Sequence, residues 1–216
     1  MPRLRPGRDG EPLPAGVEVF RLALGLMVES KDFQQTGRVP RTVFDLSSGD
    51  KASSTPRLSV YASDLTRIAE AWAFLDLSAK YGYSVHISTD QVRTVGAEMA
   101  GHCRGHQLVV EWEAKKIQDP QTGMEVLDER PAAKGHAGIA GLSEADYSSA
   151  ARKNIKRKLA AFAEVRPLPA VSPVFVSRRG RRYHRRGCKA GRASILMCRE
   201  SARARGITPC RSCNPD

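Results

Sequence analysis

The sequence predicts an α+β fold in two parts, and three observations support this prediction. Two segments, residues 63–82 and 143–165, carry apolar residues at helical spacing. Several shorter segments are rich in β-branched and aromatic residues and are separated by turn-forming residues. A stretch with three prolines in eight residues, 166–173, precedes a cysteine-rich tail. We therefore expect a mixed αβ domain at 16–165, a proline-rich linker at 166–173 and a small β-hairpin plus helix module at 174–216.

The start of the chain gives three assignments. Residues 1–15 are rich in Pro, Gly and Arg and predict a disordered basic arm. The apolar segment 17–28 fits either a strand or a short buried helix, because periodicity does not decide between them. Two β-prone runs, 42–46 and 58–61, flank a Ser/Gly/Asp/Lys loop that we expect to be exposed.

The helical segment 63–82 has a cap at Ser63, a stop at Gly82 and four apolar residues on one face. These four are Leu65, Ile68, Trp72 and Leu75. Two strands are expected next, at 83–96 and 106–117. In the segment 143–165, Ser143 and Asp146 resemble a capping box, which predicts the clearest helix of the chain.

The positive charge of the protein is concentrated in the tail. The net charge is +12, and residues 172–216 contain twelve Arg or Lys and two acids, which is +10 and leaves +2 for the rest. Such a density favours contact with phosphates of a nucleic acid. No run of about 18 apolar residues and no signal peptide is found, so we expect a cytoplasmic protein without membrane contact.

The cysteines follow the same division. Cys103 stands alone, whereas four others lie within twenty-six residues of the tail: Cys188, Cys198, Cys210 and Cys213. Without a secretion signal, clustered cysteines hold metal more often than they form disulfides.

The spacing in the tail predicts a metal site with two pairs of ligands. His184 and Cys188 are separated by three residues, and Cys210 and Cys213 by two, which is the spacing of zinc knuckles. A Cys3His set suits Zn2+. Cys198 either lies beside the site at the start of a helix or replaces His184 as a ligand, and we favour the first.

These residues resemble a known family. The sequence "RRYHRRGC", an alanine-rich helix and "GITPCRSCNPD" are similar to the metal-binding domain of the Ada DNA repair protein and to Ada-like zinc modules at the ends of bacterial proteins. The resemblance covers about one fifth of the chain, residues 174–216. In Ada the first ligand is a cysteine that accepts a methyl group from a DNA phosphotriester. His184 stands there in this chain, so the resemblance implies zinc and phosphate binding without methyl transfer.

Eight cations within fifteen residues are the expected nucleic-acid contacts. They are Arg178, Arg179, Arg181, Arg182, Arg185, Arg186, Lys189 and Arg192. Tyr183 is the only aromatic residue among them, so we expect little base stacking and little sequence specificity.

The first part offers one weak catalytic candidate. Glu113 and Lys115, after Glu111 on an expected strand, match the end of a metal-dependent nuclease signature in which carboxylates hold Mg2+. Asp90 is the only candidate for the further carboxylate. Cross-strand charge pairing explains the same residues without catalysis.

Other polar residues of the first part suggest no chemistry. The sequence "GHCRGH" (residues 101–106) offers at most three metal ligands, His102, Cys103 and His106. We expect a loop with partly buried polar groups there. His136 is expected to be a satisfied structural residue. "RLSVYASDLTRIAEAWAF" with "HAGIAGL" faintly resembles small bacterial proteins, which implies no activity.

The sequence therefore predicts a zinc-binding protein that contacts DNA phosphates through its tail. Two alternatives remain open: a Mg2+-dependent nuclease or other nucleic-acid enzyme delivered by this tail, and a zinc module that binds another protein.

Overall fold

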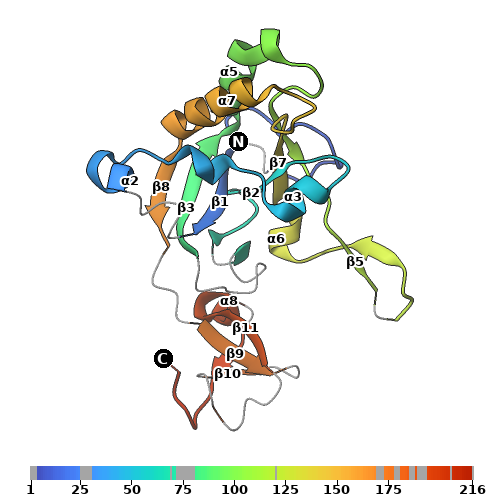
Figure 1. Ribbon diagram of the computed structural model, residues 1–216. Helices are drawn as coiled ribbons and strands as arrows, with labels where there is room; N and C mark the ends of the chain where they lie inside the picture. Colours follow the sequence, from blue (N-terminus) through green and yellow to red (C-terminus); the bar gives the residue numbers. More distant parts are fainter. Residues whose placement is uncertain are drawn as a thin grey trace.

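The computed structural model confirms the α+β class and contains two larger sheets (Figure 1). It describes residues 4–24, 31–68, 70–71, 81–119, 121–168, 173–177, 181–184, 188, 194–204 and 206–215.

An antiparallel sheet of six strands, in the order β4-β7-β2-β1-β3-β8, forms most of the first part. Its strands are β1 (Glu18–Leu24), β2 (Leu58–Ala62), β3 (Tyr81–Ser88), β4 (Val109–Trp112), β7 (His136–Ala140) and β8 (Glu164–Pro167). The apolar segment 17–28, which fitted either a strand or a helix, therefore contains the strand β1, which pairs with β2 and β3; its residues 25–28 lie outside the described residues.

Two helices cover one face of this sheet. They are α5 (Thr89–Met99) and α7 (Ser149–Phe162), and Figure 1 shows them side by side above the strands. Alternate residues of the strands, such as Val19, Val60 and Ile87, point into the main core with Ile155 and Leu159 of α7. This is the arrangement that the period of two in strands requires.

The opposite face carries a smaller apolar cluster. Phe20, Leu22 and Tyr61 of the strands pack there with Ala132 of the short helix α6 (Pro131–Lys134). A two-stranded hairpin, β5 (Lys116–Gln118) and β6 (Glu125–Leu127), extends from β4 and leaves several apolar side chains exposed.

The tail forms a four-stranded sheet in the order β11-β9-β10-β12. The bounds are β9 (Pro173–Ser177), β10 (Arg182–His184), β11 (Ser194–Cys198), α8 (Arg199–Ala204) and β12 (Thr208–Pro209). The predicted hairpin is confirmed, because Tyr183 of β10 lies opposite Val176 of β9; its turn at 178–180 lies outside the described residues. Strand β11 was not predicted.

Two strand predictions need correction. The segment 83–96 is strand β3 only as far as Ser88, and then α5 begins. Ser88 and Gln91 form a reciprocal capping box, with Ser88 Oγ accepting from Gln91 N at 3.2 Å and Gln91 Oε1 accepting from Ser88 N at 2.8 Å. The run 42–46 is not a strand either, since residues Arg41–Phe44 form the 3-10 helix η1, whose Val43 and Phe44 are buried.

Two helix predictions need correction. Helix α7 begins after the N-cap Ser148, whereas Ser143 and Asp146 form a separate turn before it. Of the helix expected at 63–82, residues 69 and 72–80 lie outside the described residues. Residues 63–65 form a turn, so Ser63 does not begin the helix, and Gly82 belongs to β3. The loop after residue 46 is exposed as expected, but it also contains the five-residue helix α3 (Ser48–Ala52), which Ser47 caps.

The described part of the expected arm is not disordered. Gly10 and Leu13 donate backbone hydrogen bonds to the carbonyl groups of Trp112 and Val110 in β4, each at 2.9 Å, and Leu13 is fully buried. The expected linker begins within a strand, because Arg166 and Pro167 pair with β3.

Candidate metal centre

Parallel pairing of β10 with β12 brings the two expected ligand pairs together. Tyr183 lies opposite Pro209 in this pair, and Cys210 N donates to Tyr183 O at 2.9 Å. The next residue of β10 is His184, so it lies beside Cys210. A tight turn then follows, in which Asn214 N donates to Cys210 O at 3.0 Å and Asn214 has a left-handed φ of 37°.

The four predicted metal ligands form one cluster. One ligand atom from each of His184, Cys188, Cys210 and Cys213 lies within 4.8 Å of all the others. Ligand atoms about 2.3 Å from a tetrahedral ion would be about 3.8 Å apart. The four ligand atoms would therefore need to move only slightly towards one another to bind such an ion. Among the described residues this is the only group of three or more His, Cys, Asp or Glu side chains that can hold a metal ion.

The environment of two ligands suits a bound cation. Backbone N–H groups of Cys213 and Ser212 donate to the Cys210 thiolate, and these hydrogen bonds lower the pKa of Cys210 to about 6. His184 is 5% exposed, and its Nδ1 is buried without a hydrogen-bond partner in the described structure. A buried nitrogen of this kind requires a partner, and a metal ion would supply it.

The structure describes few of the expected nucleic-acid contacts. Arg181 and Arg182 are exposed at the start of β10. Arg178, Arg179, Arg185, Arg186, Lys189 and Arg192 lie outside the described residues. Tyr183 is fully buried and packs in the cluster of the tail. Cys198 is the last residue of β11 and directly precedes α8, and its side chain lies outside the described structure.

The structure brings the nuclease candidates Glu113 and Lys115 together, but Asp90 lies elsewhere. Glu113 follows the edge strand β4, and Asp90 lies in the first turn of α5 after β3. Three strands lie between β4 and β3, which separates them by about 19 Å at the usual strand spacing. In the described structure the Asp90 carboxylate therefore does not lie beside Glu113 and Lys115.

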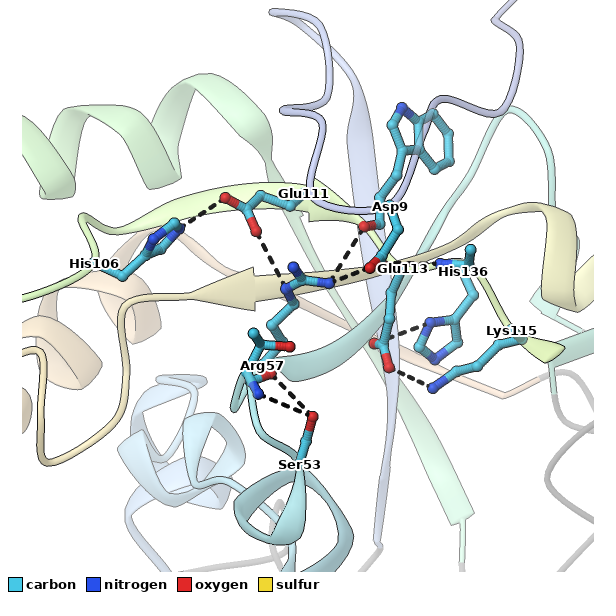
Figure 2. Close-up of polar contacts among 11 residues, drawn as sticks. Asp9, Ser53, Arg57, His106, Glu111, Glu113, Lys115 and His136 are labelled. Atoms are coloured by element: carbon cyan, nitrogen blue, oxygen red, sulfur yellow. Dashed lines mark hydrogen bonds and ion pairs between the residues drawn. The ribbon is translucent and has the colours of Figure 1, made fainter.

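Glu113 instead forms a cluster with Lys115 and His136, which sequence reasoning missed (Figure 2). Glu113 Oε1 lies 2.6 Å from Lys115 Nζ, and Glu113 Oε2 lies 3.3 Å from His136 Nδ1. Burial lowers the pKa of His136 below its usual value. His136 is not the satisfied residue that we expected, because its buried Nδ1 and Glu113 Oε2 both lack an aligned hydrogen bond.

We expect Glu113 to make the protein sensitive to acid. Burial alone would raise the pKa of Glu113, but contact with His136 and Lys115 outweighs burial and lowers the pKa from 4.5 to about 2. The stabilisation is therefore present above pH 4.5 and is lost as pH falls towards 2. Between pH 5 and pH 2, wild-type protein should lose about 2 kcal/mol more of its free energy of unfolding than Glu113→Gln does.

Urea unfolding at a series of pH values measures this difference. Glu125→Gln is the matched control, because Glu125 is an exposed acid of the hairpin with a 3.5 Å ion pair to Lys116. If wild type and Glu113→Gln lost the same stability at low pH, the Glu113 carboxylate would not contribute to the acid sensitivity of the protein.

A second polar cluster on β4 accounts for part of "GHCRGH". Glu111 is buried, and its oxygens contact Arg57 Nε at 3.1 Å and His106 Nε2 at 2.7 Å (Figure 2). The carboxylate of Asp146 accepts from His106 N at 2.7 Å. The segment is a loop only from Cys103 onward, because Ala100–His102 form the 3-10 helix η2, and most of its polar residues are exposed rather than partly buried.

A third cluster has the residue types of a hydrolase triad but not its accessibility. His86 lies 2.9 Å from both Glu18 Oε1 and Ser84 Oγ. Ser84 is fully buried and donates to Arg166 O at 3.3 Å. A nucleophile must reach its substrate, so this cluster is structural.

Comparison with known proteins does not assign the chain to a family. It matches none of the protein-family models, and neither a curated protein nor a solved structure gives a match. The described helices include none with the length and apolar character needed to cross a membrane.

Proposed function

We propose that the tail is a zinc-stabilised module that binds nucleic-acid phosphates and has no methyl-acceptor activity. The observation that carries this proposal is the single cluster of His184, Cys188, Cys210 and Cys213. Three thiolates and one imidazole are the ligands of many structural zinc sites. The tail has its own buried cluster, in which Val174, Val176 and Tyr183 of the second sheet pack with Ala202 of α8, and this supports a module separate from the first part.

Charge supports a nucleic acid as the partner. Residues 172–216 carry +10, and the two described cations of the hairpin, Arg181 and Arg182, are exposed beside the cluster. Lysine and arginine contacts to phosphates release condensed counterions and give affinity without reading the base sequence. His184 has no thiolate to alkylate, so the function proposed is binding rather than repair.

Salt-dependent binding of the zinc-loaded, full-length protein to a labelled DNA duplex tests this function. The logarithm of the binding constant should fall linearly with the logarithm of salt concentration between about 50 and 200 mM. Arg181→Ser with Arg182→Ser should reduce the slope by about two.

The matched control removes two exposed cations of α7, by Lys153→Ser with Arg157→Ser. If both double variants reduced the salt dependence of binding equally, binding would reflect net charge alone. Absence of binding at about 50 mM salt would contradict the proposal and would favour a protein-binding zinc module. Parallel titrations with RNA identify which nucleic acid is preferred.

A further inference from the structure

A cavity in the first part of the chain suggests a second site that does not depend on the Cys/His cluster. Its volume is about 440 Å3, and it is bounded by the end of β4, α6, the base of the β5–β6 hairpin and the N-terminal segment. Sites for small molecules typically occupy roughly 300–1,000 Å3. The cavity is therefore large enough for a ligand of moderate size.

The polar wall of the cavity is the cluster of Glu113, Lys115 and His136 (Figure 2). His136 is 3% exposed, and its Nδ1 faces Glu113 Oε2 at 3.3 Å. The edge-to-face contact with Tyr61, at 5.2 Å between ring centroids and 87° between planes, also fixes the imidazole. The ring is thus held with Nδ1 towards the carboxylate.

Packing alone does not require these polar groups. His136 lies in a cross-strand row with Tyr61 and Phe20, whose rings form part of an apolar cluster. An imidazole nitrogen and a carboxylate oxygen that are buried without an aligned hydrogen bond cost free energy there, which apolar side chains would avoid. Polar groups held at such a cost in a cavity are typical of ligand sites.

The lining combines charged groups with apolar surface. It contains three cations and three carboxylates: Arg5, Lys115 and Lys134 with Glu113, Asp128 and Glu129. Lys134 forms an ion pair with Glu129, and both side chains are largely exposed, so exchange of Glu129 for a ligand phosphate costs little. Apolar surface comes from four lining residues: Pro6, Trp112, Leu127 and Ala133.

We propose that this cavity binds a nucleotide, either free or as one unit of a nucleic-acid strand. The phosphate contacts Lys134 and Arg5, the flat base lies along the apolar wall, and the polar edge of the base faces Lys115 and His136. A nucleotide is the ligand class that joins an anionic group to a flat, weakly polar body with hydrogen-bonding edges.

Nuclear magnetic resonance of the zinc-loaded, full-length protein with 15N-labelled histidines tests this site. The probes are the four ribonucleoside 5′-monophosphates, their nucleosides, inorganic phosphate and a short single-stranded oligonucleotide. At least one nucleotide, free or in the strand, should shift the His136 ring resonances saturably. His86 is the internal control, because it is also buried and paired with a glutamate but does not line the cavity.

Two adjacent lysines provide matched variants. Lys115→Ala should weaken nucleotide binding about tenfold or more, because it removes a charged contact. Lys116→Ala makes the same change at a neighbour that does not line the cavity and should leave affinity within about twofold of wild type. Unchanged His86 resonances confirm folding of each variant, and Lys134→Ala, at an exposed residue, gives a second test of the phosphate contact.

Three outcomes would overturn the proposal. They are no saturable shift of His136 with any nucleotide or the oligonucleotide, equal loss of affinity in Lys115→Ala and Lys116→Ala, and binding of inorganic phosphate as tight as that of every nucleotide. A failure of duplex binding by the tail would leave the measurement at His136 unaffected, so the two proposals fail separately.

Discussion

Purified full-length protein should contain about one zinc ion per chain, and Cys210→Ser with Cys213→Ser should abolish this content. The double variant removes two of the four ligands, including the thiol whose pKa is already lowered to about 6. Structural zinc supplies on the order of 10 kcal/mol to small modules. The four described residues that form the buried cluster of the tail cannot replace a contribution of this size.

Metal analysis measures the zinc content, and hydrogen exchange measures the stability of the tail. Loss of zinc should abolish protection of the tail strands while the six-stranded sheet keeps its protection, because the two have separate buried clusters. Cys103→Ser is the control, since Cys103 lies outside the cluster, and Cys198→Ser should also retain zinc if Cys198 is not a ligand. Full zinc content in the double variant would contradict the assignment of these ligands.

Arg57→Met should lower the free energy of unfolding by about 3 kcal/mol. The Arg57 and Glu111 side chains are 10% and 6% exposed, and removing the guanidinium leaves a buried carboxylate whose remaining ion-pair partner among the described residues is His106. For a protein of this size, such a loss lowers the melting temperature by about 6 to 12 °C. Thermal unfolding at pH 7 measures the change.

A surface ion pair is the matched control for this prediction. Lys158→Met removes a cation whose pair with Glu98 is largely exposed, and it should cost less than about 1 kcal/mol. Adding Glu111→Leu to Arg57→Met should restore part of the stability, because no unpaired charge then remains buried. If Arg57→Met and Lys158→Met lowered the free energy of unfolding equally, this would contradict a buried ion pair between Arg57 and Glu111.

The metal ligands could be predicted from sequence because each pair is local. The spacing of His184 with Cys188 and of Cys210 with Cys213 limits where the ligand atoms can point, whatever the rest of the chain does. Helix α5 could also have been found, since Ser88 and Gln91 form a capping box that marks its start. The hydrophobic pattern of residues 83–96 taken alone predicts one continuous strand.

The cavity could not be predicted, because it depends on contacts between distant segments. Glu113 meets His136 only through the register of β4 with β7, in which Glu113 N donates to His136 O at 3.2 Å. A shift of one residue would turn these side chains to opposite faces. The N-terminal segment likewise lies along β4 through long-range hydrogen bonds, and neither its composition nor its charge indicates such pairing.

The position of this segment has a consequence for self-association. Strand β4 is at the edge of the six-stranded sheet, and an unpaired edge offers free N–H and C=O groups to a strand of another molecule. Pro12 bridges to Glu111 there, and the hydrogen bonds of Gly10 and Leu13 occupy carbonyl groups on either side. Residues 10–13 thus cover this edge and oppose aggregation through it.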